Sequence, residues 1–244
     1  MRLTRIHLPA SLIIGSEIAL SASACNHLLR VLRLREGTGL VVFDGAGNEH
    51  SAELCRIVGH QVYVRIGTKI NRASESPLHI TLVQGISRGE RMDWTLQKAT
   101  ELGISAIVPV LTTRSVVKLD EKQSAKKQDH WQSIVISACE QSGRSVVPKV
   151  HTPIHLTEYL SNQSHDHDRL LLEPNANTAL ADLAQVSTHI DLLIGPEGGL
   201  DDSEIKQAKQ ANFKSVSLGP RVLRTETAAV VALSVLQAGW GDFK

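Results

Sequence analysis

The chain has 244 residues, with 26 Lys and Arg, 25 Asp and Glu, and a formal net charge of +1. This length suits one large or two modest domains, and the balanced charge argues weakly against a general nucleic-acid-binding protein. Because no apolar run approaches ~18 residues, no transmembrane helix is expected.

The amino-terminal residues and the cysteines indicate where the protein acts. Residues 1–5 lack the apolar core of a secretory signal. Cys25, Cys55 and Cys139 are scattered and form no Cys-x-x-Cys motif, which is typical of a protein kept in a reducing compartment. We therefore expect a cytoplasmic protein without membrane association.

The first third of the chain is predicted to contain short strands and one helix. The helix is expected over residues 22–34, and a hairpin turn over residues 44–48. Strands are expected over residues 39–43, 50–57 and 61–66. These short strands together predict a small β-barrel.

Positive charge is concentrated in this first third. Residues 1–72 carry nine Lys or Arg against five Asp or Glu, whereas residues 73–244 carry seventeen against twenty. Counterion release would make such a patch a salt-sensitive RNA contact. An ordinary solvated surface accounts for the charge alone equally well.

A polar linker over residues 71–77 divides the chain into predicted domains of residues 1–72 and 73–244. After it, strand-like apolar runs alternate with helical segments. In order, a strand, a helix, a strand, a helix and two strands are expected over residues 78–85, 92–102, 106–111, 121–141, 170–172 and 192–194. Such alternation predicts an α/β domain with a parallel sheet and right-handed crossovers.

A tract of alternating His and Asp occupies residues 165–168, and such tracts can bind metals. It stands in a polar loop, however, with no cysteine nearby and no matching ligands elsewhere in the chain. We therefore expect a solvated loop and no metal site.

Two glycine-rich loops follow, at residues 195–199 (Gly-Pro-Glu-Gly-Gly) and residues 219–224 (Gly-Pro-Arg-Val-Leu-Arg), each after a short apolar run. Glycine permits positive φ angles and lets a ligand approach the backbone. Asp201 and Glu204 form a predicted capping box after the first loop, and Thr225 is the predicted N-cap of the next helix. Two such loops at neighbouring strand ends predict one ligand held between them.

The second loop also supplies charged residues. Arg221 and Arg224 stand at its rim beside Glu226, and arginines in a glycine loop are good ligand contacts. The helix expected over residues 226–237 is apolar on nearly every side, so burial on more than one face is expected. No Gly-x-Gly-x-x-Gly follows a first strand and no Gly-x-x-x-x-Gly-Lys-Ser/Thr occurs, which makes a nicotinamide enzyme or a P-loop NTPase unexpected.

These loops resemble the signatures of the bacterial 16S ribosomal RNA uridine-N3 methyltransferases, the ribosomal small-subunit methyltransferase E family of the SPOUT superfamily. The resemblance covers essentially the whole chain in the family's order, and its C-terminal motifs are the specific ones. The similar segments are residues 26–33, 43–45, 87–92, 100–103, 138–144, 195–200 and 218–228.

The resemblance implies both a fold and a reaction. The implied fold is an N-terminal PUA-like β-barrel that docks on RNA, followed by a SPOUT-type α/β domain whose trefoil knot and cofactor site occupy about residues 170–238. The implied reaction is methylation of N3 of a specific uridine in 16S rRNA of the small ribosomal subunit, with S-adenosylmethionine as donor and no metal. A homodimer is also implied, with the helix after Thr225 at the interface.

Residue chemistry and the resemblance together give candidate site residues. Arg224 is the candidate for stabilising a uracil anion, although it could instead form a salt bridge to Glu226 or Glu197. Both carboxylates are candidate bases, and either could instead cap a helix or orient an arginine. The candidate cofactor-binding residues are Leu172, Glu173, Ile194, Gly195, Pro196, Gly198, Gly199, Leu218, Gly219, Arg221, Leu223 and Thr227. The candidate RNA contacts are Arg30, Arg33, Arg88, Arg91 and Arg144, the last of which could instead contact a partner subunit.

Two other functions stay open at this stage. An enzyme of the same superfamily could methylate a ribose 2′-hydroxyl, and a non-catalytic RNA-binding protein could use the same scaffold. Cys139 does not point to a further reaction, because a cysteine nucleophile serves methylation at uracil C5 and N3 methylation gains nothing from it. We expect a buried helix cysteine.

Overall fold

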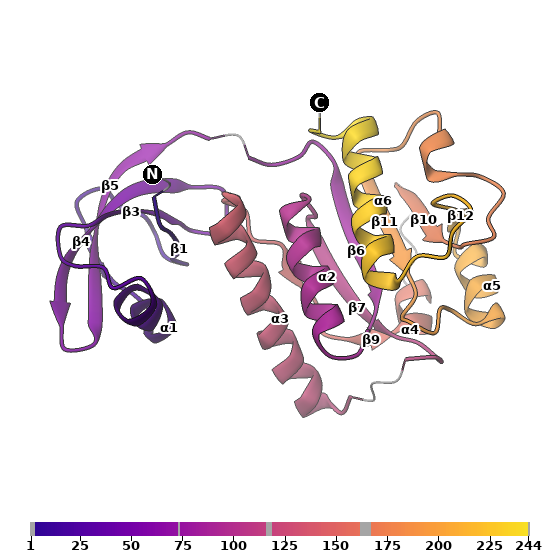
Figure 1. Cartoon of the computed structure of the whole chain (residues 1–244), viewed down its shortest axis with the longest axis horizontal. Coiled ribbons are helices and arrows are strands. Elements are labelled where there is room, and N and C mark those ends of the chain that lie inside the picture. Colours follow the sequence, from indigo (N-terminus) through magenta and orange to yellow (C-terminus); the bar gives the residue numbers. More distant parts are fainter. Residues whose placement is uncertain (1–2, 73, 116–118, 162–166, 244) are drawn as a thin grey trace. The chain divides into compact units, whose positions relative to one another are not determined.

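The computed structural model describes residues 3–72, 74–115, 119–161 and 167–243 (Figure 1). They form two compact units, Met1–Glu75 with Cys139–Val147, and Ser76–Ala138 with Pro148–Lys244. The segment Cys139–Val147 therefore lies with the first unit, whereas the predicted boundary between residues 72 and 73 would put it in the second domain. Long-range hydrogen bonds explain this, since the Val147 N–H donates to the Gly45 carbonyl at 2.9 Å.

A five-stranded sheet in the order β1-β3-β4-β5-β2 forms the first unit. Alternate residues of the long strands, such as Leu54, Val64 and Ile66, point into its apolar core. The strands β1 and β2 have three residues each, too few for a periodic signal, and the sequence analysis missed them. The strands are β1 (Arg5–His7), β2 (Glu17–Ala19), β3 (Gly39–Phe43), β4 (Glu49–Val58) and β5 (Gln61–Ile70).

The predicted helix over residues 22–34 is shorter and less regular in the structure. It consists of α1 (Ala22–Asn26), which Ser21 caps, and one π-helical turn, η1 (His27–Val31). The turn ends at Val31, and Arg33, two residues further on, has a φ of 54°, which lies in the left-handed region. The prediction of a helix to residue 34 was therefore wrong at its C-terminal end, because apolar spacing does not distinguish a π turn from an α turn.

A seven-stranded sheet forms the centre of the second unit, in the order β12-β10-β11-β6-β7-β8, with β9 paired to β7. Each of these pairings is parallel, which confirms the predicted parallel α/β domain. The strands are β6 (His79–Gly85), β7 (Ala106–Leu111), β8 (Lys149–Val150), β9 (Ile154–His155), β10 (Asp168–Leu172), β11 (His189–Ile194) and β12 (Lys214–Val216).

Helices cover both faces of this sheet. Figure 1 shows α2 and α6 together over one face, and α4 and α5 lie over the other. Strand residues facing either side, such as Leu192 and Leu193, are consequently buried. The helices are α2 (Glu90–Glu101), α3 (Glu121–Ser142), α4 (Leu156–Ser161), α5 (Asp202–Gln210) and α6 (Thr225–Trp240), with a 3₁₀ turn, η2 (Leu180–Asp182).

Two expectations from the sequence concern the helices: the capping box of α5 and the absence of a transmembrane helix. The predicted capping box of α5 is confirmed, because the Asp201 side chain accepts the Glu204 N–H and the Glu204 side chain accepts the Asp201 N–H. Across the described residues, no helix combines the length and apolar character needed to cross a membrane.

Candidate active site

A pocket of about 520 Å³ lies at the carboxyl ends of β10, β11 and β12. Its walls come from residues 171–174, residues 194–200 and the segment between Val216 and Ala228. Because the strands are parallel, these loops leave the sheet at one edge, where α/β sheets hold their ligands. The structure thus brings the two glycine-rich loops together around one pocket.

The first glycine loop passes very close to β6. A Cβ atom on Gly85 would lie 2.5 Å from the backbone nitrogen of Pro196, and one on Gly195 would lie 3.0 Å from the backbone of Gly199. Gly199 itself has a φ of 66°. Close backbone contacts therefore require glycine at positions 85 and 195, and the left-handed backbone conformation favours glycine at position 199.

A buried polar network joins the two loops. The Thr225 hydroxyl donates to the Gly195 carbonyl at 2.6 Å and accepts a hydrogen bond from Gln84 Nε2 at 3.0 Å. Gln84 is fully buried near the end of β6 and also donates to the Gly85 carbonyl. Gln84 is not among the residues predicted from the sequence, although a polar residue at the end of an apolar strand is a usable signal.

The predicted N-cap role of Thr225 is wrong. Arg224 occupies the N-cap position of α6 without a side-chain cap hydrogen bond, and Thr225 is the first helical residue. The Thr225 hydroxyl faces the Gly195 carbonyl instead of the N–H groups of its own helix. A tertiary contact has therefore replaced the local one that the sequence favoured.

Two arginine side chains on the pocket wall are free to bind a ligand. Within the described parts of the chain, neither the Arg221 nor the Arg224 guanidinium group makes a hydrogen bond or an ion pair with protein, and both residues are exposed. Arg224 accordingly forms no salt bridge to Glu226 or Glu197 in this structure. Both guanidinium groups are available to an incoming ligand.

Glu197, in the first loop, lines the pocket and is bound by two arginines. Its Oε1 accepts the Arg88 N–H at 2.9 Å and the Arg91 guanidinium at 3.1 Å. Partial burial raises the pKa of Glu197, but these hydrogen bonds outweigh burial and hold the pKa below its usual value. A carboxylate with this environment is suited to holding the loop more than to taking a proton.

The other two pocket carboxylates differ from each other. Glu226 has a buried Oε2 atom with no hydrogen-bond partner among the described residues. The neighbouring Ser215 hydroxyl and Lys209, whose Nζ lies 3.0 Å from Glu173 Oε2, hold the pKa of Glu173 below its usual value. Glu226, by contrast, has no ion pair with a cation among the described residues.

Every candidate cofactor residue except Thr227 lines the pocket, and so do Arg224, Glu226 and Glu197. Arg114 follows β7 and also lines the pocket, but it was not predicted from the sequence. Its Nη1 donates to the carbonyls of Gly198 and Leu200 at 3.1 and 3.3 Å. No motif surrounds Arg114, so its role depends on a chain segment that sequence patterns do not connect to the loops. Pro174, Ile205, Val216 and Ser217 also line the pocket and were not predicted as site residues from the sequence.

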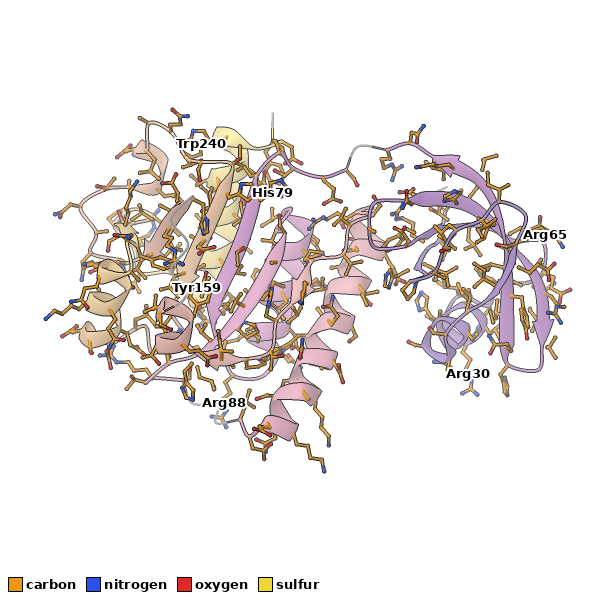
Figure 2. All side chains as sticks on the ribbon, turned by 180° about the vertical axis from the view of Figure 1, so that it is seen from behind. Arg30, Arg65, His79, Arg88, Tyr159 and Trp240 are labelled. Atoms are coloured by element: carbon orange, nitrogen blue, oxygen red, sulfur yellow. The ribbon has the colours of Figure 1, made fainter. Side chains whose placement is uncertain are left out.

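The candidate RNA contacts lie in three different places. Arg88 and Arg91 precede and begin α2 beside Glu197, and Figure 2 marks Arg88 at the surface. Arg30 and Arg33 are exposed in the first unit. Arg144 is only 5% exposed and pairs with Glu75, so its position gives no support to an RNA contact.

Cys139 and the histidine tract can also be placed. Cys139 is buried as expected, and burial raises the pKa of its thiol to about 12, which leaves it without nucleophilic thiolate at neutral pH.

The prediction of a solvated loop is wrong for His167. Its Nε2 lies 3.0 Å from a carboxylate oxygen of Asp191, and its side chain is only 18% exposed. The rest of the tract through residue 166 lies outside the described residues, among which no cluster could hold a metal.

Comparisons with known proteins match both units. A family model for an RNA methyltransferase domain matches residues 74–237, and one for an RNA methyltransferase PUA domain matches residues 20–67. The ribosomal RNA small subunit methyltransferase E of Buchnera aphidicola subsp. Schizaphis graminum is 33% identical, over 99% of this chain and 98% of its own. That of Bacillus subtilis is 32% identical, over 93% of this chain and 90% of its own. The crystal structure of the Neisseria gonorrhoeae protein of this name, bound to S-adenosyl methionine, matches with a TM-score of 0.93 and 42% identity over 100% of both chains.

Proposed function

Because the chain belongs to the ribosomal RNA small subunit methyltransferase E family, we propose that it transfers a methyl group from S-adenosylmethionine to N3 of a uridine in 16S rRNA. The observation that carries this proposal is the pocket itself. Two glycine-rich loops, two arginines without partners and one carboxylate with a free oxygen converge there at the ends of parallel strands.

The pocket suits S-adenosylmethionine in size and lining. Its volume of about 520 Å³ falls within the range of ~300–1,000 Å³ usual for small-molecule sites. Leu172, Ile194, Leu218 and Leu223 supply apolar walls for an adenine ring, while the glycine backbone allows close approach to its edges. When bound, the sulfonium supplies an electrophilic methyl group, so the chain needs only to align the acceptor and activate it.

The protein's chemical task concerns the acceptor nitrogen. Uridine N3 carries a proton at neutral pH, and this proton must leave before or as the nitrogen attacks. In the proposed mechanism, Glu226 accepts the proton through its unpartnered Oε2, and the guanidinium of Arg224 stabilises the negative charge that spreads over the uracil carbonyls. Glu197, held by Arg88 and Arg91, positions the loop around the donor.

The proposal extends to partners and location. We take the small ribosomal subunit as the substrate particle, which places the protein in the cytoplasm. We also propose a homodimer, since Val230, Val231 and Val235 of the apolar helix α6 are only half-buried within one chain. The trefoil knot within about residues 170–238 belongs to this proposal as well.

The test is methyl transfer from labelled S-adenosylmethionine to small subunits that lack the modification, followed by nucleoside analysis. A single N3-methyluridine product is expected. Label in a 2′-O-methyl nucleoside would show that the methyl acceptor is a ribose hydroxyl and not N3 of a uridine. No incorporation into subunits or naked RNA would favour a non-catalytic RNA-binding protein. An Arg65→Ala variant serves as the control, because Arg65 pairs with Glu17 in the first unit and is not among the residues that line the pocket.

A further inference from the structure

The turn that follows β7 brings an arginine against the first glycine loop. Arg114 stands in this turn, residues 112–115 (Thr-Thr-Arg-Ser), and lines the pocket. Its Nη1 donates to the carbonyls of Gly198 and Leu200, which lie 84 and 86 residues further along the chain. A Cβ atom on Gly198 would lie only 3.1 Å from the Cβ atom of Arg114, so the glycine leaves room for the arginine side chain.

The backbone of this turn is held on both sides of Arg114. The Ser115 hydroxyl accepts the Thr112 N–H at 3.1 Å, and the Ser115 N–H donates to the Thr112 carbonyl at 3.0 Å. The Thr113 N–H donates to Glu204 Oε1 at 2.7 Å, and Glu204 is buried in the capping box of α5. The turn therefore fixes where the Arg114 side chain begins, and the two loop carbonyls fix where its Nη1 lies.

One edge of the Arg114 guanidinium group is left open. A guanidinium group is planar and carries five N–H donors. Among the described residues, only Nη1 of Arg114 has hydrogen-bond partners, so the edge formed by Nε and Nη2 has none. The two parallel N–H groups of such an edge match the two oxygens of a carboxylate. Because Nη1 is already held, a ligand at this edge would immobilise little more of the side chain.

The other arginines that line the described pocket are less suited to that contact. Arg91 already bonds to the Glu197 carboxylate at 3.1 Å. The guanidinium groups of Arg221 and Arg224 have no bond to the described protein, so a ligand must order either side chain from end to end. Arg114 combines a position that the protein sets with an unoccupied edge for a carboxylate.

We propose that the Nε–Nη2 edge of Arg114 binds the α-carboxylate of S-adenosylmethionine. This inference rests on the proposed function in taking that compound as the methyl donor. The carboxylate is the one anionic group of the donor, since its sulfonium and ammonium groups are positive and its adenosine is neutral. An arginine therefore attracts the carboxylate and repels the rest of the methionine part. The same guanidinium group connects the bound donor to the carbonyls of Gly198 and Leu200, and so to the first loop.

The experiment compares the binding of two donors to the full chain by calorimetry. One is S-adenosylmethionine, and the other is its decarboxylated form, which keeps the sulfonium and the amine but lacks the carboxylate. The variants at the proposed subsite are Arg114→Ala and Arg114→Gln, the second of which keeps an N–H donor for the loop carbonyls. Arg221→Ala tests an arginine of the second loop. Lys206→Ala is the matched control, because it removes an exposed positive charge from α5 and Lys206 does not line the pocket.

The wild-type protein should bind S-adenosylmethionine about 10–100-fold more tightly than the decarboxylated form, the usual effect of hydrogen bonds to a charged group. In both Arg114 variants this ratio of affinities should fall close to one. The ratio is the measure because losing the loop hydrogen bonds weakens the binding of both donors alike. Arg221→Ala and Lys206→Ala should keep the wild-type ratio.

Two results would overturn the assignment of the carboxylate to Arg114. One is a wild-type ratio in both Arg114 variants, which would leave Arg114 the role of holding the loop or of binding an RNA phosphate. The other is a ratio that falls in Arg221→Ala and not in Arg114→Ala, which would assign the carboxylate to the second loop.

The carboxylate subsite and the proposed reaction can fail separately. If the ratio changes as expected but no N3-methyluridine forms, the subsite stands and the proposed reaction fails. If methylation proceeds and the Arg114 variants keep the wild-type ratio, the reaction stands and the subsite fails. A wild-type protein that binds neither donor would overturn both.

Discussion

At the scale of single residues, the pocket separates two kinds of charged group. Glu197 and Glu173 are already paired with protein cations, whereas Arg221, Arg224 and Glu226 keep unused hydrogen-bonding capacity. Groups left unpartnered in a pocket are those that a ligand can engage without breaking protein contacts. We therefore assign the chemistry to the second loop and the support of the pocket to the first.

Replacing Arg224 by Ala should lower kcat by about 10²–10³, the usual loss when one preorganised donor to a developing anion is removed. The Kd for S-adenosylmethionine should change little, because the proposed contact is to the uracil. Single-turnover methyl transfer and calorimetric cofactor binding measure the two effects separately. Arg224→Lys keeps the charge but not the planar guanidinium group, so its kcat should lie between those of wild type and Arg224→Ala. An equal loss in cofactor affinity and in rate would assign Arg224 to cofactor binding instead.

Glu197 should make stability depend on pH in a defined direction. Because its folded pKa is lowered, it stabilises the fold above its unfolded pKa of ~4.3, and that contribution is lost as the pH falls through the folded pKa. The melting temperature of Glu197→Gln should therefore lie below that of wild type at neutral pH, and the gap should close under acid conditions. Thermal scans between pH 3 and pH 7 test this. A gap that widened in acid would contradict the assignment.

At the scale of elements, the site depends on how closely β6, the first glycine loop and the start of α6 approach one another. The network of Gln84, Thr225 and the Gly195 carbonyl fixes that approach with hydrogen bonds. Gly85 allows it sterically, since its missing Cβ leaves room for the Pro196 backbone. A change at either point should affect both loops together.

Gly85→Ala should destabilise the protein by about 1–3 kcal/mol, the usual cost of overpacking. The Cβ would lie 2.5 Å from backbone, which cannot move aside as a flexible side chain can. Chemical denaturation and cofactor binding should both report the change. Gly239→Ala is the matched control. Gly239 lies in α6, and a Cβ at this position would have no described atom of another segment within 4 Å, so the substitution should be neutral or stabilising. Equal stabilities of the two variants would refute the steric account.

At the scale of the whole molecule, the apolar surface of the second unit favours self-association. Val222 is 83% exposed at the pocket rim, and the valines of α6 are only half-buried. A helix that is apolar on nearly every side is buried on more than one face in the functional assembly. One chain covers only part of it, which is why we expect a second copy to cover the rest.

Sedimentation at micromolar concentration should therefore give twice the chain mass of 26.6 kDa. Val231→Glu should shift the protein toward monomer, because it places a carboxylate on the half-buried face of α6. Val58→Glu is the control, since Val58 is 54% exposed in the first unit and should leave the mass unchanged. A wild-type monomer at this concentration would remove the dimer from the proposal.

Local sequence patterns determined much of this protein. Alternating apolar runs predicted the parallel sheet, and the Asp201–Glu204 spacing predicted a capping box that the structure contains. The motifs also identified the family, which the comparisons confirm. The capping and strand signals each lie within a few residues along the chain, where spacing favours one pattern of hydrogen bonding or burial.

Only the tertiary structure decided the remaining points. Thr225 bonds to Gln84, 141 residues away, instead of capping its own helix, and Glu197 is held by Arg91, 106 residues away. The π turn before Arg33 likewise depends on which leucines the core accepts. Sequence spacing does not encode contacts between distant segments, because each segment offers several local solutions of similar free energy and the fold selects among them.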